Sequence, residues 1–524
     1  MNRAGDGEMA NHSFGKFRSA CVAIGLAASL AACGGSSPPS VTLTQPEDPV
    51  GSNLTQISSD PYTIAPGQHA TEVEPHLLAN GTTLVAAFQT GRIDLGGATD
   101  IGWATSTDGG ATWSHGFLPG LTTGEGTGPY DAASDPAVAY DAAHGVWMIA
   151  SLPISNSGLV PAVVVNRAID DGFTWEPAVS ADTSSVSSDK NWIVCDSWLS
   201  SPYYGNCYLQ WDDPVNQDRI LMSTSSDGGQ TWGPALPTAS QSDGIGGQPL
   251  VQPDGTVIVP IEIIVSHTAF MEAYLSPDGG GSWSAPVTIS NIQFHADAAG
   301  IRSSPLPSAA VDGAGNVWVV WEDCRFRSNC STNDLVYSTS PDGVNWGPVT
   351  RIPIDDVSTS VDHFIPGIGI DPATSGASAH VGLHYYYYSN SNCTVSTCQL
   401  FVGYISSANG GSSWNAPNPL TAAPMQLGWL PNSQNGLMVG DYIATAFTNG
   451  VPHGVFAVAQ ANSGTTFKEA IYTGQGLTAR AEARQLSSAG DVVLHNMSDQ
   501  IEKEKPEKGV KLPRQRSGSI APGR

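Results

Sequence analysis

The octapeptide SSDGGQTW occupies residues 225–232. Its Asp can accept hydrogen bonds from the backbone of its own turn, its glycines permit positive φ angles, and its Thr and Trp can pin the turn against a strand. Near-copies occur five more times, as STDGGATW at 106–113, AIDDGFTW at 168–175, SPDGGGSW at 276–283, SPDGVNW at 340–346 and SANGGSSW at 407–414. The motif therefore predicts a recurring turn with a structural role.

The spacing of the motifs indicates a structural repeat. Their third residue, Asp or Asn, falls at positions 108, 170, 227, 278, 342 and 409, so the gaps are 62, 57, 51, 64 and 67 residues. Each motif follows an apolar stretch, a turn rich in Asn, Asp and Gly, a second apolar stretch, a loop and a third stretch. A short run after each Trp predicts a fourth strand, so the repeat is a unit of four strands.

The motif and its spacing resemble the Asp-box, or bacterial neuraminidase, repeat over nearly all of residues 54–475. The resemblance implies an all-β fold, a β-propeller of four-stranded blades with the Asp-box in the turn between a blade's third and fourth strands. A further unit without a motif starts at Asp441, and residues 53–58 can supply its fourth strand. Closure of this kind leaves no edge strand unpaired and predicts seven blades; six blades, as in sialidases, is the alternative.

Composition agrees with such a fold and argues against one class of partner. Charged residues make up 13% of the 524 residues, and the formal net charge is −26. Abundant Gly, Ser, Thr, Pro and Trp are typical of short strands joined by tight turns. Because phosphate binding needs clustered Lys and Arg, we expect no nucleic-acid partner. We expect the protein to be a monomer.

The two ends of the chain predict segments outside the propeller. An apolar run at 21–30 precedes Leu30-Ala31-Ala32-Cys33, which resembles a bacterial lipobox, and a plain secretory signal is the alternative. We therefore expect a signal peptide at 1–33 and a lipid at Cys33, which makes this an exported lipoprotein of the cell envelope that meets a membrane only through its anchor. Residues 34–52 predict a flexible tether, 53–494 a single propeller, and 495–524 a disordered charged tail.

The remaining cysteines predict disulfide bonds. They form three close pairs: Cys195 with Cys207, Cys324 with Cys330, and Cys393 with Cys398. Each pair can close one hairpin or loop, as expected in an oxidising compartment. A zinc site is less favoured because no pair has CxxC spacing.

Acidic residues are expected to gather near the axis of the propeller. Five of them fall at the starts of innermost strands in different blades: Glu74, Asp135, Asp189, Asp362 and Asp441. Like charges brought together repel unless a cation, protonation or water relieves them. Since oxygen ligands suit a hard cation, these residues predict a calcium site. The alternative is that water, backbone N–H groups, Lys190 or His363 satisfy them.

The resemblance to sialidases implies a glycan ligand and a known set of side chains: three arginines on the sugar carboxylate, a Tyr nucleophile paired with a Glu, and an Asp acid/base. By position in the repeats, the substrate-binding candidates are Arg92, Arg302 and Arg325, and the catalytic candidates are Asp94, Asp100, Tyr442 and Glu322. One of Tyr385–Tyr388 is the alternative to Tyr442, and Glu262 is the alternative to Glu322. The sequence departs from the family at Val73-Glu74-Pro75, where sialidases have Arg-Ile-Pro. An acid there would repel the substrate carboxylate.

Two functions remain open from the sequence. One is a sialidase-like, glycan-processing enzyme of the exo-α-sialidase type, which uses an acid and a nucleophile across a glycosidic bond. The other is a non-catalytic surface propeller that binds a glycan, a protein or a cation through its acidic funnel. Convergence of the three arginine candidates on one carboxylate-sized ligand would favour the first.

Overall fold

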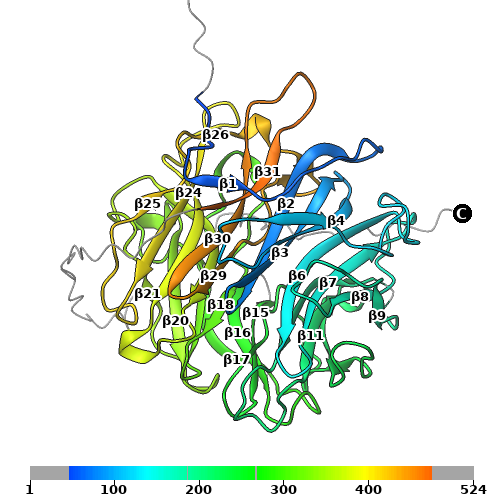
Figure 1. Ribbon diagram of the computed structural model, residues 1–524. Coiled ribbons are helices and arrows are strands. Elements are labelled where there is room, and N and C mark those ends of the chain that lie inside the picture. The colour runs from blue at the N-terminus through cyan, green and yellow to red at the C-terminus, as the bar shows by residue number, and fades with distance from the viewer. Residues whose placement is uncertain (1–46, 186, 266–267, 475–524) are drawn as a thin grey trace, which may run out of the picture. The chain divides into compact units, whose positions relative to one another are not determined.

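The computed structural model describes residues 47–474 apart from 186, 266 and 267 (Figure 1). The regular elements of this part are β-strands and a few short 3-10 helices, so the fold is all-β as expected. No helix among the described residues is long and apolar enough to cross a membrane. The predicted signal peptide, Cys33, most of the tether, residues 475–494 and the charged tail lie outside the described residues.

Each sequence repeat forms an antiparallel meander of four strands. The first three meanders are β2 (Gln68–Asn80), β3 (Thr83–Arg92), β4 (Ala98–Ser106) and β5 (Ser114–Phe117); β6 (Ala132–Asp141), β7 (Val146–Ile154), β8 (Val163–Ala168) and β9 (Val179–Asp182); and β10 (Asp189–Cys195), β11 (Cys207–Asp213), β12 (Arg219–Ser225) and β13 (Leu236–Pro237). The first two share one sheet through a single bridge between Ala98 and Ala133.

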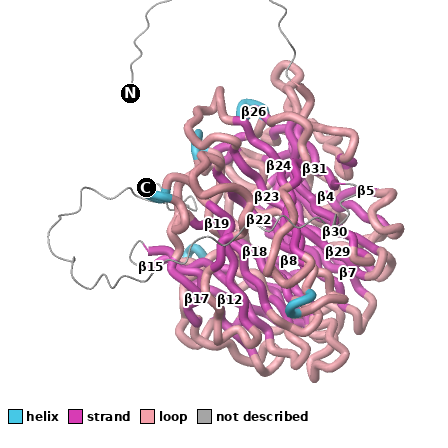
Figure 2. Tube along the Cα trace, turned by 90° about the vertical axis from the view of Figure 1, so that its left-hand side faces the viewer, coloured by secondary structure: helices cyan, strands magenta, loops and turns pink. Residues whose placement is uncertain are grey.

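The next three meanders follow the same order. They are β14 (Leu250–Val251), β15 (Val257–Val265), β16 (Thr268–Ser276) and β17 (Val287–Asn291); β18 (Ser308–Val311), β19 (Val317–Asp323), β20 (Asp334–Ser340) and β21 (Thr350–Arg351); and β22 (Asp362–Ile370), β23 (Val381–Tyr388), β24 (Gln399–Ser407) and β25 (Asn418–Pro419). The short strand β26 (Met425–Gln426) also pairs with β24, and β27 (Asn432–Ser433) pairs with β28 (Gly436–Leu437). Figure 2 shows that the described part consists of strands and loops, with short helical turns in the connections between strands.

A seventh meander joins the two ends of the described chain. Its strands are β29 (Ala444–Thr448), β30 (Val451–Ala459), β31 (Glu469–Gly474) and, as fourth strand, β1 (Leu54–Gln56). β1 runs antiparallel to β31, with Leu54 opposite Gly474, and Figure 1 shows orange β31 beside blue β1 and β2. The strand expected at 53–58 therefore pairs where the sequence predicted it.

The core lies between neighbouring meanders. Met148 and Val165 of the second meander, for example, share one apolar cluster with Leu209 and Trp211 of the third. The seventh meander contributes Phe456 to a cluster that also holds Phe88 of the first meander and Tyr386 of the sixth. Burial on both faces explains why the second and third strands are apolar almost throughout.

The repeated motif forms the same hydrogen-bonded turn at several positions. In SSDGGQTW, Ser225 Oγ donates to Asp227 Oδ1 at 2.9 Å, and the amide and hydroxyl of Thr231 donate to the Asp227 carboxylate at 2.9 and 2.6 Å. The copies at 106–113 and 276–283 repeat these bonds with nearly the same distances. Trp232 is only half-buried, whereas Trp283 of the next copy is 3% exposed. The motif is thus a self-contained turn between third and fourth strands.

Four innermost strands carry a β-bulge with a left-handed residue. The bulges interrupt the pairing of β2, β6, β10 and β22, and the residues with positive φ are Glu74 (53°), Asp135 (49°), Lys190 (48°) and Ile365 (49°). Positive φ is uncommon for such residues and a genuine outlier for a β-branched one. A bulge frees a backbone N–H from the ladder, and strained residues of this kind cluster at functional sites.

All three predicted disulfides are present: Cys195–Cys207, Cys324–Cys330 and Cys393–Cys398. The first joins β10 to β11. The other two close the loops between second and third strands in the fifth and sixth meanders. These loops border the candidate site.

Candidate functional site at the starts of the inner strands

The candidate residues share one end of the meanders. In an antiparallel meander, the start of the first strand lies beside the loop between the second and third strands, and the Asp-box turn lies at the opposite end. Asp135 and Lys190 lie in the first half of β6 and of β10, Glu74 lies at the bulge in the middle of β2, and Asp441 just precedes β29. This end of the molecule is called the loop face below.

Lys190 is the centre of a buried ion cluster at the loop face. Its ammonium group contacts the Asp441 carboxylate and lies 4.0 Å from Asp135 Oδ2. Arg302 also binds Asp441, with its Nε donating to Oδ1 at 2.6 Å and a terminal nitrogen contacting Oδ2. The third meander and the segment before the fifth are thereby tied to the seventh. This group, with Glu74 and Asp189, is called the Lys190 cluster.

Carboxylates of the loop face also accept hydrogen bonds from backbone amides, and two of these amides, those of Lys190 and Ile365, lie in the bulges. Asp135 Oδ2 accepts the Lys190 N–H at 3.1 Å, and Glu74 Oε1 accepts the Asp441 N–H at 3.3 Å. Glu322 Oε1 likewise accepts the Ile365 N–H at 3.4 Å. Each bond crosses from one meander to a neighbour. These acids therefore act as links between sheets.

Electrostatics divides the acids of this cluster into charged and neutral ones. Burial would raise the pKa of Asp441, but Arg302 and Lys190 outweigh it and hold that pKa well below its ordinary value. For Glu74, burial and then the charges of Asp135 and Asp441 raise the pKa to about 8. Glu74 is therefore mainly protonated at neutral pH, and Asp441 is ionised.

The expected ring of five acids is divided in the structure. Four of them belong to the Lys190 cluster, whereas Asp362 has Asn333, His295 and Asp297 as its electrostatic neighbours. Within the cluster, the chain's own Lys190 and Arg302 lie where the sequence analysis placed Ca²⁺. Two cationic side chains therefore balance these carboxylates, and calcium binding there stays a prediction from the sequence.

A second acid group surrounds Asp362 at the start of β22. Asn333 donates its backbone N–H to Asp362 Oδ1 at 2.6 Å and its side-chain amide to Asp297 Oδ1 at 3.3 Å. His295 Nε2 lies 3.9 Å from Asp362 Oδ2. Burial raises the pKa of Asp362 to about 6, while burial and the Asp362 charge raise that of Asp297 well above its ordinary value.

Glu322 belongs to this second group. It is fully buried on β19, and burial followed by the charge of Asp297 raises its pKa well above the ordinary value. The sequence predicted Glu322 as the partner of Tyr442, but the carboxylates near Tyr442 are Glu74, Asp135 and Asp441. The sequence also missed Asp297 and Asn333, because both lie in loops without a strand pattern.

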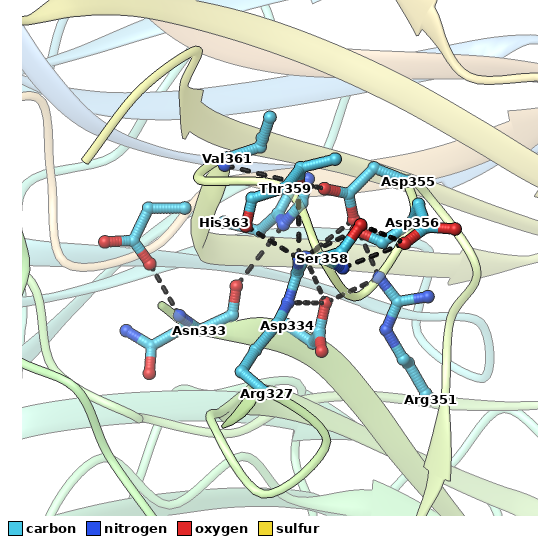
Figure 3. A network of polar contacts seen from close by, with 11 residues as sticks. Arg327, Asn333, Asp334, Arg351, Asp355, Asp356, Ser358, Thr359, Val361 and His363 are labelled. Carbon is cyan, nitrogen blue, oxygen red and sulfur yellow. Dashed lines mark hydrogen bonds and ion pairs between the residues drawn. The ribbon is translucent and has the colours of Figure 1, made fainter. Parts of the chain in front are cut away.

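Beside this group, two arginines and two aspartates form a structural network (Figure 3). Arg327 binds Asp334 and Asp355 at 2.6 Å each, and Arg351 binds the same two carboxylates at 2.8 and 2.7 Å. Asp334, Asp355 and His363 offer ligand atoms within 4.8 Å of one another, a spacing that could suit a metal. Both carboxylates already pair with guanidinium groups, so the network fastens loops together.

The three arginine candidates do not form a shared clamp. Burial and then the charge of Arg302 lower the pKa of Arg92 to about 10, so these two lie in one electrostatic neighbourhood. Arg302 is engaged by Asp441, however, and Arg325 is engaged by Asp323 at 2.7 Å and by Ser290. The clamp expected from the resemblance fails because each of the last two already has its own carboxylate.

Of the two aspartates proposed as acid/base, the structure favours Asp100. Asp94 is exposed in the loop before β4, whereas Asp100 is fully buried on that strand. Asp100 Oδ2 accepts a hydrogen bond from the Tyr62 hydroxyl at 2.8 Å. Burial is the main cause that raises the pKa of Asp100 to about 7. The sequence offered no signal for Tyr62, which precedes the first repeat.

A small cavity of about 20 Å³ lies beside the Lys190 cluster. Its lining comes from the starts of the third, fourth, fifth and seventh meanders: Lys190, Asn191, Trp192, Gly246, Gln248, Leu306, Pro307 and Tyr442. The Tyr442 hydroxyl donates to the carbonyl of Pro136 at 3.1 Å, and its ring meets that of Trp192 edge-on at 5.0 Å. Four separate sheets therefore meet around one cavity, which is called the axial cavity below.

No model of a known protein family matches the sequence, and no curated protein matches it. Similar solved structures include the Hadza microbial sialidase Hz136, at 14% identity over 78% of this chain with a TM-score of 0.41. The chain covers 66% of that sialidase, just under two thirds of its length.

Two other solved structures are similar at the same level. NanB sialidase from Streptococcus pneumoniae is 15% identical over 81% of this chain and 70% of its own, with a TM-score of 0.39. An ulvan lyase of polysaccharide lyase family PL25 is 10% identical over 80% of this chain and 95% of its own, with a TM-score of 0.48. All three scores are below 0.5, so function has to be argued from the residues of this chain.

Proposed function

We propose that this chain is a seven-bladed β-propeller that processes glycans at its loop face. Ring closure is supported by β1, which completes the seventh meander, and by the packing of that meander against both the first and the sixth. It is also supported by the axial cavity, since residues from four meanders can line one small cavity if their inner strands surround an axis.

The observation that carries the glycan proposal is the lining of the axial cavity. It combines the aromatic side chains of Trp192 and Tyr442 with the amides of Asn191 and Gln248. Aromatic side chains give the cavity an apolar wall, and amides match a sugar hydroxyl group as both donors and acceptors. Ligand sites are typically apolar with a few convergent polar groups, as this one is.

We propose Asp100 as the general acid. A catalytic acid works best when its pKa lies near the working pH, and Asp100 has a pKa of about 7. Its partner Tyr62 is only partly buried and donates its hydroxyl hydrogen to Asp100. The protonated carboxyl would deliver its proton to the oxygen that leaves as the glycosidic bond breaks.

An exo-sialidase specificity is the less favoured form of this proposal. Glu74 stands where the family's first arginine is expected, and Arg302 and Arg325 are held by Asp441 and Asp323. A non-catalytic glycan-binding propeller is the second candidate. The small volume of the axial cavity favours it, because a 20 Å³ cavity admits only one small group of a ligand.

Export and lipid anchoring belong to the same proposal. The three disulfides support an oxidising compartment. The lipobox-like sequence that ends at Cys33 supports an anchor in the cell envelope.

The test is a screen of the purified protein against neutral glycans, uronic-acid polysaccharides and sialosides, with product release as the readout. Asp100→Asn keeps the shape of the side chain but cannot donate the proton, so we expect a loss of about 10²–10⁴-fold on natural linkages. The loss should be much smaller on nitrophenyl glycosides, whose leaving group needs no proton. Asp131→Asn, an exposed change on the same face, is the control. Product release by neither the wild type nor the control would refute processing.

A further inference from the structure

The lining of the axial cavity indicates which kind of ligand group the cavity accepts. Asn191, on the bulge of β10, is 1% exposed and lines this cavity. Neither its Oδ1 nor its Nδ2 forms a hydrogen bond with any part of the described chain. A buried amide with both polar atoms unpaired is rare in native proteins and calls for a partner in the space that it faces.

The same wall offers further polar atoms and a rigid apolar side. Gln248 is 7% exposed, and its Oε1 accepts the Ala309 N–H at 3.0 Å, which fixes the direction of the amide. The indole of Trp192 is held between Tyr442 at 5.0 Å and His76 at 4.4 Å. Leu306 and Pro307 add apolar side chains to the lining. The cavity is therefore shaped before any ligand arrives.

Charge at the cavity is balanced. Lys190 is the cationic side chain in the lining, and it contacts Asp441 and lies near Asp135. Arg302 binds the same Asp441 carboxylate through its Nε. A carboxylate ligand would meet cations that are already paired and four nearby acids, and it would have to give up its hydration.

Size limits the ligand group as strictly as charge does. A cavity of about 20 Å³ holds a group of roughly one water molecule's size. A hydroxyl group on a sugar meets that limit and can both accept from Nδ2 and donate to Oδ1 of an amide. A carboxylate or the glycerol chain of a sialic acid exceeds it.

We propose that the axial cavity binds one uncharged hydroxyl-sized group of a neutral sugar, and that the Asn191 amide is its recognition group. The proposal rests on the proposed glycan function and narrows its substrate class to neutral sugar termini. It places specificity in a residue that no sialidase-like motif marks in this sequence.

The experiment measures binding of methyl glucoside, methyl galactoside and methyl N-acetylglucosaminide, with methyl glucuronide and the methyl glycoside of N-acetylneuraminic acid as the anionic set. Titration calorimetry on the full chain gives Kd for the wild type, Asn191→Ala and Asn191→Leu. Asn156→Ala, which removes an exposed amide in a loop of the same face, is the matched control. Thermal unfolding of each variant establishes that it is folded.

We expect at least one neutral glycoside to bind the wild type and the control equally, and to bind both Asn191 variants about tenfold more weakly or not at all. Anionic glycosides should bind more weakly than neutral ones. Equal binding of neutral glycosides by the wild type and the folded Asn191 variants would overturn the proposal, as would preference for the anionic set or no binding of any neutral glycoside. Binding of a neutral glycoside without product release would overturn the proposed glycan processing and support the assignment of the cavity. Product release from sialosides alone would support glycan processing and overturn the assignment of the cavity to neutral sugars.

Discussion

Lys190 and Asp441 are 251 residues apart in the chain, yet they form a buried ion pair in which the two side chains are 4% and 1% exposed. The pair joins the bulge of β10 to the segment before β29, and Arg302 binds the same Asp441 carboxylate. One carboxylate thus holds together three segments that enter the loop face from different sheets.

Loss of the Asp441 charge should destabilise the fold strongly. Asp441→Asn leaves Lys190 and Arg302 buried without their counterion, so we expect the free energy of unfolding to fall by about 3–5 kcal/mol. Lys190→Met should lower the free energy of unfolding by less than Asp441→Asn does, because Arg302 still pairs with Asp441. Denaturant unfolding, with Asp131→Asn as the exposed control, measures both. A midpoint for Asp441→Asn equal to that of the wild type would argue against the central role of this carboxylate.

Removal of divalent cations should leave stability unchanged. Because Lys190 and Arg302 already balance the Lys190 cluster, we expect the same thermal midpoint with EDTA and with added calcium. A midpoint that falls in EDTA and recovers with calcium would restore the cation site expected from the sequence. Repeating the comparison with Asp362→Asn would tell whether the second acid group is responsible.

Stability should depend on pH through Glu72. Ser58 Oγ donates to Glu72 Oε2 at 2.5 Å and accepts the Ile471 N–H at 2.8 Å, so this acid helps to join β1, β2 and β31. Burial raises the Glu72 pKa to about 8. The protonated form is therefore favoured by folding, and its contribution is complete below the unfolded pKa near 4.3 and is lost as pH rises toward 8.

Glu72→Gln removes that titration. Relative to this variant, the wild type should lose up to about 1.4 kcal/mol of stability per pH unit between pH 5 and 8. Urea unfolding at several pH values measures the difference. A constant difference between the two proteins across that range would show that Glu72 does not titrate in this window.

The Asp-box tryptophans should matter for folding according to their burial. Trp283 is 3% exposed and packs edge-on against Tyr274 at 5.8 Å and Tyr208 at 6.3 Å, so Trp283→Ala should cost about 3–5 kcal/mol. Trp232 is half-buried, and Trp232→Ala should cost clearly less. Glycan binding at the opposite end should be unchanged in both folded variants. An equal loss of unfolding free energy in Trp283→Ala and Trp232→Ala would contradict the expectation that the effect follows burial.

Several features of the fold could be predicted from the sequence because they are local. The turn at Asp227 is specified by residues within four positions of it, and the three disulfides join cysteines at most 12 residues apart. The pairing of residues 54–56 with β31 was long-range but followed from the rule that a sheet needs its edges covered.

The candidate site was harder because its contacts join distant segments. Bulges at Lys190 and Ile365 have no sequence signal, since Gly or Asn is the usual residue at positive φ. The partners of Asp362, among them Asn333 and Asp297, come from irregular loops whose course depends on tertiary packing. The acids of the loop face could be predicted from the sequence. Which of them contact Lys190 and which contact Asn333 could not be predicted, because these contacts depend on the tertiary structure.

The most direct test of the account is a crystal structure of the protein soaked with a neutral methyl glycoside. We predict seven blades closed by β1, with the sugar at the axial cavity and one of its hydroxyl groups bonded to the amide of Asn191, beside Trp192 and Tyr442. A sugar bound only elsewhere on the surface, or inner strands that do not surround a common axis, would contradict it.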